Sequence, residues 1–563
     1  MARACRVLPD LTAVDRAFDY TLPPSIDQDV PVGTIVRVPL HGRRIRGWIA
    51  EIDVEPEGRE LLTVLGVVSA GPPADVIALS DWVAWRWCGP RVAVLRSASP
   101  PNNVTLNLVC AEAAPTGPST TSTADAVVRW PPLLDRRAAV AARCATDGST
   151  IVCVADAGRS RALASYLREQ GRTVALIHSF EPPAARTDAW RTAARGNCVV
   201  VGGRIAALAP VPDLRAAIVV DDADEALQEE RSPTWHARDV LRERATRAGA
   251  VFTVFSPAPT IEAGSVTAAP PPDVERAGWP RVQVVDRRAE PPGAGLLSEE
   301  LTIALRAADG LAVCVLNRRG RFRLLVCANG HLSRWDRQAE RPQVCPECGS
   351  TQLKVLRAGV TRVREELAAL LPGERVEEVD AATGEVPDAD VLIGTEAVLH
   401  RSVVRRRRPA LVAYLDFDQE LLAPRYRAAT QAHWLATRGA QLLASRPRDE
   451  TRLLLQTRMP DHVVVRALVH ADPEQVAESE REYRAALGYP PFGALAELSG
   501  NDDALLAAAD AARVLGVQVF GPSDGHALVH AAGWDDLADA LAPAVAAGRA
   551  LGRVRAVVDP ARV

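Results

Sequence analysis

Residues 197–225 read NCVVVGGRIAALAPVPDLRAAIVVDDADE, and this stretch decides the fold class. It contains two short, almost wholly apolar runs, at 198–201 and 216–220, separated by a loop and a proline-bounded turn. Runs of this length that are rich in valine and isoleucine, without polar alternation, are typical of strands buried on both faces of a parallel sheet. The stretch therefore predicts an α/β domain.

The second apolar run ends in acidic residues, Asp221, Asp222 and Asp224. Nucleotide-binding sheets place a magnesium-holding carboxylate at the carboxyl end of a parallel strand, so the arrangement is similar to the second motif of a helicase motor. A motor also needs a lysine in a glycine-rich loop to hold the β- and γ-phosphates. The only lysine in the chain is Lys354, far from this region. The sequence therefore predicts the layout of a motor without its principal phosphate ligand.

The composition is that of a globular protein with several domains. At 563 residues the chain is too long for one hydrophobic core, and about three to five domains are expected. A hydrophobic fraction of 48% excludes general disorder. With a formal net charge of −4 the chain has no overall basic field, so any contact with DNA has to come from local clusters of arginine. Arginine suits this role because its guanidinium can bind a phosphate through two parallel hydrogen bonds.

Cysteine usage and hydropathy indicate the compartment. Most cysteines lie singly, several of them within apolar runs, as small buried residues do in a reducing environment. The amino-terminal stretch has no apolar segment followed by a small-residue cleavage site. No run approaches the roughly 20 apolar residues that span a bilayer. We expect a cytoplasmic protein with no membrane partner.

The amino-terminal segment, residues 1–70, consists of short strand-like pieces punctuated by proline and glycine, which predicts a small β-barrel or β-rich module. Its loop at 41–46 concentrates positive charge at Arg43, Arg44 and Arg46. Clustered arginines position proteins on nucleic-acid backbones, but a solvated hairpin tip would look the same. Both interpretations stay open.

Two longer units alternate strand-like and helical segments, at 126–268 and 275–460. Such alternation predicts doubly wound α/β domains, here a tandem pair with a cleft between them. A cysteine-containing insert at 320–355 interrupts the second unit. The remainder, 461–563, has the pattern of a small α+β domain.

Several specific stretches carry a resemblance to a known family. They are VLPDLTAVDRAFDYTLP near the start, VVVGGRIAALAPVPDLRAAIVVDDADEALQEERSPTWHARDVLR in the first α/β unit, VCVLNRRGRFRLLVC before the insert, and then CPECGS, VLIGTEAVL, LVAYLDFD and LGYPPFG. Over essentially the whole chain their order resembles the bacterial primosomal protein N′ (PriA) family of replication restart helicases.

The resemblance implies two tandem RecA-like helicase lobes and their accessory modules. Mapped on this chain, a 3′-end DNA-binding domain takes 1–70 and a winged-helix-like domain with a linker takes 71–125. The first lobe takes 126–268, and the second lobe takes 275–460 with a zinc-type insert at 320–355. A carboxy-terminal domain takes 461–563.

The resemblance also implies a role for Phe18, Asp19 and Tyr20, which stand where the family recognises a 3′ end. A carboxylate such as that of Asp19 can accept a hydrogen bond from a terminal hydroxyl. A turn or helix-capping aspartate is the alternative. The DNA-binding residues expected from the sequence are therefore these three together with the arginines of the 41–46 loop.

The chain departs from the family where a motor does its chemistry. The region 127–149, where the family has a loop ending in Gly-Lys-Thr, reads VVRWPPLLDRRAAVAARCATDGS, with one glycine and no lysine. The family's Asp-Glu-Glu-His becomes a degenerate acidic motif beginning at Asp221 and Asp222. The closing arginine motif is altered to QLLASRPR, in which Arg446 remains. Catalysis of phosphoryl transfer depends on such positioning groups, so we expect no useful ATP hydrolysis, no catalytic residues and no secure ATP site.

The insert carries a candidate metal site. Cys345 and Cys348 have the spacing of a zinc knuckle, and Cys327 and His331 lie upstream, so the four can form one Cys3His zinc site. The family's two-ion set of eight cysteines is not present, so two zinc ions are not supported. Asp336 is an alternative fourth ligand, and a turn with free cysteines is the alternative to any metal.

Three hypotheses of function follow. The first is a replication restart protein that binds stalled or branched forks, assembles the primosome with primosome and replisome proteins, and has no helicase activity. The second is an active ATP-dependent 3′–5′ helicase with a non-standard nucleotide site, and the third is a zinc-ribbon interaction module. Retained arginines favour the first over the third, and the missing lysine favours it over the second. The run at 405–408 is either a strand-contacting surface or a solvated charge run.

Overall fold

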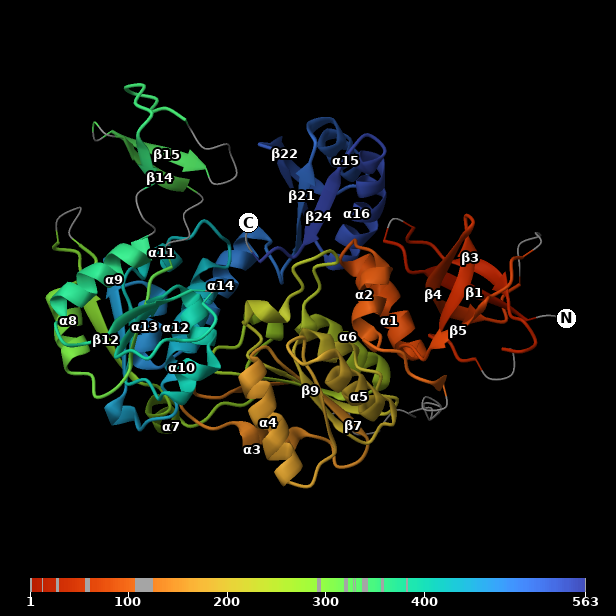
Figure 1. Ribbon diagram of the computed structural model, residues 1–563, viewed down its shortest axis with the longest axis horizontal. Helices are drawn as coiled ribbons and strands as arrows, with labels where there is room; N and C mark the ends of the chain where they lie inside the picture. The colour runs from red at the N-terminus through yellow and green to blue at the C-terminus, as the bar shows by residue number, and fades with distance from the viewer. Residues whose placement is uncertain are drawn as a thin grey trace.

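The computed structural model describes residues 3–12, 14–26, 30–55, 61–106, 125–290, 295–317, 322–327, 329, 331–336, 343–355, 359–380 and 383–561. Figure 1 shows the amino-terminal module at one end, two α/β lobes side by side, and the carboxy-terminal domain between the amino-terminal module and the second lobe. A small sheet made by the insert stands apart from the second lobe. The predicted multidomain α/β architecture is confirmed.

The amino-terminal module is a five-stranded antiparallel sheet in the order β2-β1-β4-β3-β5. Its strands are β1 (Ala4–Pro9), β2 (Phe18–Thr21), β3 (Ile35–Leu40), β4 (Arg43–Ile52) and β5 (Gly66–Ser69). His41 and Gly42 join β3 to β4, with φ of 47° and 75°. Positive φ at both positions suits a tight two-residue hairpin turn, and only glycine adopts it without strain.

Two helices, α1 (Ala74–Arg86) and α2 (Arg91–Ala98), cover one face of this sheet. Trp48 of β4 packs against Ile77 and Leu95 of the helices, and its indole N–H donates to Ser99 Oγ at 2.9 Å. Alternation along β4 therefore buries Trp48 under the helices while leaving the hairpin end of the same face uncovered.

The first lobe is a six-stranded, wholly parallel sheet in the order β6-β11-β10-β7-β9-β8. The two apolar runs of the deciding stretch are its buried strands β9 and β10, as predicted. The elements of this lobe are β6 (Ala126–Arg129), α3 (Arg137–Arg143), β7 (Ser149–Val154), α4 (Ala157–Glu169), β8 (Val174–Ile177), α5 (Pro183–Ala194), β9 (Val199–Gly202), η2 (Arg204–Leu208), β10 (Leu214–Val220), η3 (Glu225–Leu227), α6 (Ala237–Ala248), β11 (Val251–Ser256) and η4 (Ile261–Ala263).

The strand order reverses between β7 and β10, because the chain leaves β7 toward β8 on one side and returns to β10 on the other. In open parallel sheets, ligands bind in the crevice that such a reversal opens at the carboxyl ends of the strands. Asp156 follows β7 and Asp221 follows β10, so both carboxylates stand at this crevice.

The second lobe has the same architecture, a six-stranded parallel sheet in the order β12-β20-β19-β13-β18-β17. Its elements, with the connecting α7, are α7 (Pro272–Ala277), β12 (Arg281–Asp286), α8 (Glu299–Arg306), β13 (Ala312–Val315), α9 (Gly359–Leu370), β17 (Val376–Val379), β18 (Val391–Gly394), η5 (Glu396–His400), α10 (Ser402–Arg406), β19 (Leu411–Tyr414), α11 (Asp418–Leu421), α12 (Ala428–Leu442), η6 (Arg448–Glu450) and β20 (Arg452–Thr457).

The insert between β13 and α9 forms a three-stranded antiparallel sheet, β15-β14-β16, from β14 (Phe322–Cys327), β15 (Leu332–Asp336) and β16 (Leu353–Val355). After the second lobe, α13 (Val463–His470) and α14 (Glu474–Leu487) lead to the carboxy-terminal domain. That domain is an antiparallel sheet, β22-β23-β21-β24, with two helices, built from β21 (Ala494–Gly500), α15 (Asp502–Val514), β22 (Gln518–Ser523), β23 (His526–Ala531), α16 (Trp534–Arg549) and β24 (Val554–Val558).

A buried ionic cluster joins both lobes to the carboxy-terminal segment. Glu262 Oε1 of the first lobe accepts from Arg427 of the second lobe at 2.7 Å and from Arg484 of α14 at 2.9 Å. Arg427 also donates to Asp559 Oδ1 at 2.8 Å. Burial opposes ionisation of Glu262, but the two guanidinium groups outweigh it and hold its pKa well below the ordinary value. Removing one partner would strand a buried charge, so the cluster fixes the three parts relative to one another.

Among the described residues, no helix is both long and apolar enough to cross a membrane.

Candidate functional site

An arginine face lies at the hairpin end of the amino-terminal sheet. In the β3–β4 register Arg37 stands directly opposite Arg46, and Pro39 stands opposite Arg44. Residues directly opposite in an antiparallel pair, and residues two apart on a strand, project from the same side of the sheet. Arg37, Arg44 and Arg46 therefore share one face; we call these three the arginine face.

All three side chains of the arginine face are exposed, and no described residue forms an ion pair with them. Like charges directly across a strand pair destabilise the pair by roughly 0.2–1 kcal/mol. A surface that keeps Arg37 opposite Arg46 is therefore suited to an anion that lies between them. Arg43 stands opposite Leu40 and projects toward the other side, so the structure separates it from Arg44 and Arg46.

The carboxylate of Asp19 lies elsewhere on the module. Arg6 donates from Nε to Asp19 Oδ1 at 3.0 Å and from Nη1 to Glu51 Oε2 at 2.8 Å. Among the described residues no donor reaches the second oxygen of Asp19, and its side chain is 17% exposed, so it can still accept a hydrogen bond. Glu51 lies five positions after Arg46 and seven after Arg44 on β4, which places Asp19 roughly 17–24 Å from these two arginines along the strand direction, at about 3.4 Å per residue.

Phe18 and Tyr20, on either side of Asp19 in the sequence, make contacts within the sheet's core. Tyr20 is buried, and its hydroxyl donates to the carbonyl of Pro39 at 3.2 Å. Phe18 packs partly against the same inner core, and the guanidinium of Arg16 lies 4.6 Å from its ring centroid. Of the predicted triplet, Asp19 is the member whose side chain projects to the side of the sheet that carries Trp48 and the arginine face.

In the cleft between the lobes, Asp221 is engaged by arginine. Arg136 donates from Nη1 to Asp221 Oδ1 at 2.6 Å and from Nη2 to Oδ2 at 2.5 Å. Arg159 Nη1 adds a bond to Oδ2 at 3.1 Å. From the second lobe, Gln441 Nε2 donates to Oδ1 at 3.1 Å. Both oxygens that would coordinate magnesium are thus occupied by N–H donors.

Asp156 makes the matching contact across the cleft. Its side chain caps α4 by accepting from the backbone N–H of Arg159 at 2.7 Å. Arg438 of α12 donates to its other oxygen at 2.6 Å, and Arg405 lies 3.5 Å away. Arg438 and Arg405 belong to the second lobe. Asp156 and Asp221 with their donors therefore link the two lobes, and we call these two carboxylates and their donors the inter-lobe lock.

The electrostatics of the lock follow from burial and pairing. Burial opposes ionisation of Asp221, but Arg136 and Arg159 outweigh it and hold its pKa below the ordinary value. Burial likewise opposes ionisation of Asp156, and Arg438 with Arg159 lowers its pKa strongly. Because both folded-state values are depressed, the lock contributes its stability above the unfolded pKa of about 3.9 and loses it only as pH falls further.

The rest of the acidic motif is also structural. Asp222 is fully buried, and its Oδ2 accepts from the hydroxyl of Thr260 at 2.5 Å and from the Thr260 backbone at 3.1 Å. Burial raises the pKa of Asp222 against the opposing charge of Arg238. Asp224 caps η3 by accepting from the backbone N–H of Ala226. The motif is therefore arranged for folding contacts, not for metal coordination.

Two other predicted arginine groups also make structural contacts. Arg446 donates to the carbonyl of Arg408 at 2.7 Å, and Arg448 donates to the carbonyl of Trp279 at 2.9 Å. In the run at 405–408, Arg405 reaches across the cleft to Asp156, and Arg407 bonds the carbonyl of Pro387 at 2.9 Å. Arg405, Arg407, Arg446 and Arg448 thus make contacts within the protein, whereas Arg406 and Arg408 are exposed.

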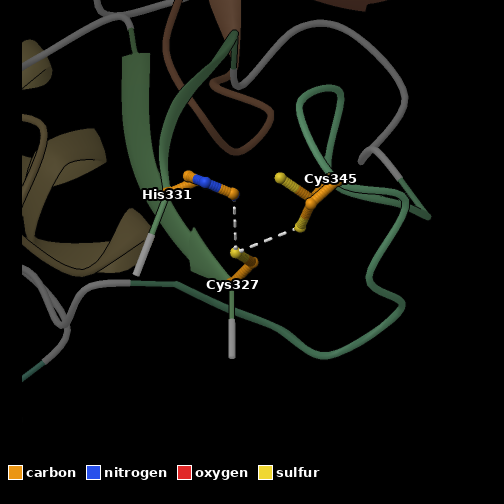
Figure 2. A group of neighbouring side chains, drawn as sticks. Cys327, His331 and Cys345 are labelled. Atoms are coloured by element: carbon orange, nitrogen blue, oxygen red, sulfur yellow. Dashed lines mark hydrogen bonds between the residues drawn. The ribbon is translucent and has the colours of Figure 1, made fainter. Parts of the chain in front are cut away.

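The four predicted metal ligands come together at the insert. The Sγ or ring-nitrogen atoms of Cys327, His331, Cys345 and Cys348 all lie within 4.8 Å of one another. Cys327 Sγ is 3.6 Å from His331 Nδ1 and 3.6 Å from Cys348 Sγ. Figure 2 shows the side chains of Cys327, His331 and Cys345 converging on one point. The group could hold one metal ion, and the ligand set is complete without Asp336.

A family model describing the PriA 3′ DNA-binding domain matches residues 6–100. The match begins within β1 and runs past the end of α2, and so includes both the arginine face and Asp19.

Relatives of known name align along nearly all of the chain. The probable replication restart proteins PriA of Mycobacterium tuberculosis and Mycobacterium bovis are each 30% identical to it, over 91% of this chain and 89% of their own length. The replication restart protein PriA of Bacillus subtilis is 27% identical over 60% of this chain and 48% of its own. The chain belongs to the PriA family.

Solved structures align less closely with this PriA-family chain. A DEAD box protein of Methanococcus jannaschii is 12% identical, with a TM-score of 0.30, over 62% of this chain and 86% of its own. S. cerevisiae Dbp5 bound to RNA is 10% identical, with a TM-score of 0.33, over 64% and 83%. The architecture of the two lobes is given by the strand order of their own sheets.

Two residues of the candidate sites were not predicted from the sequence. Arg37 lies outside the 41–46 loop and joins the arginine face only through the β3–β4 register; the alternation of β3, with exposed Arg37 between buried Val36 and Val38, was the available signal. Arg136 stands in the loop that replaces the phosphate-binding loop, and only the tertiary contact with Asp221 reveals its role.

We predict that Asp221→Asn strongly destabilises the PriA-family chain. The change leaves Arg136 and Arg159 buried without their counter-charge, which costs roughly 3–5 kcal/mol when one partner of a buried pair is removed. The measurement is the midpoint of urea unfolding at pH 7. Asp135→Asn is the matched control, because Asp135 pairs with Arg137 at the surface and such pairs contribute about 0–1 kcal/mol. A carboxylate kept for magnesium would tolerate the change, so an unchanged midpoint contradicts the lock.

Proposed function

We propose that the chain binds branched DNA at stalled replication forks through its amino-terminal module and supports restart without hydrolysing ATP. The arginine face carries this proposal. Three exposed guanidinium groups without carboxylate partners among the described residues stand on one side of a two-stranded ribbon, inside the segment that matches a 3′ DNA-binding domain. Phosphate contacts of this kind supply most of the affinity of DNA binding.

The spacing of the arginine face supports a sugar–phosphate backbone as its ligand. Arg44 and Arg46 are two residues apart on one strand, a separation of about 6.8 Å. Successive phosphates of one DNA strand are farther apart than the 3.4 Å or so of axial rise, because the backbone winds around the helix axis. A backbone running along β4 would therefore bring neighbouring phosphates to the two guanidinium groups.

The absence of ATP hydrolysis is supported by the inter-lobe lock. Stabilising a transferring phosphoryl group requires a magnesium ion and a phosphate-binding lysine. Here Asp221 has both oxygens occupied by Arg136, Arg159 and Gln441. An active helicase with a non-standard site would first have to break these contacts. Primosome and replisome proteins are the partners that this role implies, and the cytoplasm is its location.

Zinc is the metal that fits the Cys3His group. A tetrahedral zinc with Zn–S near 2.3 Å and Zn–N near 2.05 Å sets ligand separations of about 3.75 Å between two sulfurs and about 3.6 Å between sulfur and nitrogen. The Cys327–Cys348 and Cys327–His331 distances are both 3.6 Å. Glu347 lies 4.0 Å from His331 Nε2, where a carboxylate can orient a metal-bound imidazole. Zinc would here supply folding stability to the insert.

The arginine face can be tested by a charge-matched comparison. We expect the triple variant Arg37→Ala, Arg44→Ala, Arg46→Ala to bind forked DNA more weakly and to flatten the dependence of log affinity on log salt by up to about three units, about one per phosphate contact. Fluorescence anisotropy across a salt series measures both. Arg43→Ala, on the other side of the same hairpin, should change the slope far less. If Arg43→Ala flattened the salt dependence as much as the triple variant, the result would contradict the proposed role of the arginine face.

The 3′-end role of Asp19 can be tested separately. A carboxylate accepts from a terminal hydroxyl and repels a terminal phosphate, so Asp19→Asn should reduce discrimination between forks that end in a 3′-hydroxyl and forks that end in a 3′-phosphate. The two forks are compared at fixed ionic strength. Glu51→Gln is the control, because it removes the other partner of Arg6 and leaves Asp19 in place. If the unmodified protein binds both forks alike, Asp19 has no such role.

The metal proposal predicts one zinc per chain by elemental analysis. Cys348→Ser should lower the content, because structural zinc needs its full set of four ligands. Cys88→Ala, at a cysteine outside the insert, should keep one equivalent. Two equivalents in the unmodified protein would reveal further ligands, and a zinc-free folded protein would show that the insert holds without metal.

A further inference from the structure

A cavity of about 570 Å3 opens between the two lobes beside the lock. It lies at the carboxyl ends of β7 and β10, the crevice where the strand order of the first lobe reverses. Volumes of about 300–1,000 Å3 are typical of small-molecule sites. The cavity is therefore large enough for an organic ligand, and the composition of its two walls indicates which kind.

The wall from the first lobe is apolar apart from Asp135, Arg136, Arg137 and Arg159, whose charges are paired with one another or with Asp221. Val154 and Val220, the last residues of β7 and β10, form part of it together with Val140 of α3 and Leu163 of α4. The loop before α3, PPLL at 131–134, completes this side. Side chains of this kind accept an apolar or aromatic body and cannot hold a charged head group.

The wall from the second lobe is cationic. Arg405, Arg406 and Arg408 line it, at and just beyond the end of α10. Arg405 is directed to Asp156, at 3.5 Å. Within the described part of the chain, Arg406 and Arg408 have no carboxylate partner, and the only hydrogen bond recorded for either side chain runs from Arg408 Nε to the carbonyl of Ser445, at 3.0 Å. Two guanidinium groups thus face the cavity with N–H donors that can bind a ligand.

The carboxylates around the cavity are already neutralised. Asp221 is engaged by Arg136 and Arg159, and Asp135 pairs with Arg137 at 2.7 Å. A divalent cation needs free carboxylate oxygens, and it would meet an excess of arginine here. The cavity consequently favours an anion that arrives without a metal ion.

We propose that this cavity binds an organic phosphate: a phosphate monoester on an apolar or aromatic body, held without a divalent cation. The phosphate lies against Arg406 and Arg408, and the body packs on Val154, Val220 and Leu163. Arginine matches phosphate geometry with paired N–H donors, and these charge-assisted bonds are strongest where water is partly excluded. The site is separate from the arginine face and does not depend on DNA binding.

The head and the body of the ligand can be tested separately by calorimetry in EDTA. The probe is 1-naphthyl phosphate, compared with 1-naphthol, which has the body alone, and with inorganic phosphate, which has the head alone. We expect the complete probe to bind at least tenfold more tightly than either part, and magnesium not to improve binding. Adenosine monophosphate, as a further arm, distinguishes nucleotides from other organic phosphates. Failure of the complete probe to bind, or a requirement for magnesium, overturns the proposal.

Two kinds of variant locate the binding. The double variant Arg406→Ala, Arg408→Ala should weaken the probe at least tenfold. Ala162→Glu should do the same, because Ala162 lines the cavity from an exposed position of α4, where a carboxylate repels the phosphate without disturbing the core. Arg407→Ala is the control, since Arg407 is directed away to Pro387 and Asp388. Unchanged probe affinity in the first two variants, in proteins that unfold at the same temperature as the unmodified chain, overturns the proposal. Fork affinity, measured in parallel, should be unchanged.

Discussion

A carboxylate buried at the bottom of a closed cleft cannot remain without a partner, and the pairing of Asp221 with Arg136 answers this constraint inside the chain itself. In a motor the corresponding charge is met by a metal ion that comes and goes with nucleotide. Here it is met by a guanidinium on the same polypeptide, which does not leave. The arginine thus supplies within the chain the positive charge that the carboxylate needs.

The remaining contacts between the parts have the same character. Gln441 and Arg438 join the second lobe to the first at the lock, and Glu262 joins both to α14 through Arg427 and Arg484. Each of these charges is desolvated, so separating the parts would expose unpaired ions to a low-dielectric surface or require their rehydration. These contacts tie the two lobes and α14 together in the structure.

Much of this could be predicted from the sequence. Uninterrupted Val and Ile runs indicated the parallel sheets, because strands buried on both faces have no need of polar alternation. The cysteine spacing indicated the ligand set of the insert, because two thiolates two residues apart reach one ion. The roles of Arg136 and Arg37 could not be predicted in this way. The role of Arg136 depends on its contact with Asp221, 85 positions away. The role of Arg37 depends on which residue of β4 stands opposite it. Neither tertiary distance nor strand register can be deduced from composition or local periodicity.

The separation between Asp19 and the arginine face has a geometric consequence. Both project from the same side of one sheet, the arginine face near the hairpin end of β4 and Asp19, on β2, level with the other end of β4. Their separation along the strands, roughly 17–24 Å, equals about five to seven steps of 3.4 Å along a duplex axis. A strand terminus held at one end and a backbone held at the other would thus define a fixed span of nucleic acid, so the module would act as a caliper that measures how far a DNA end lies from the flanking arm.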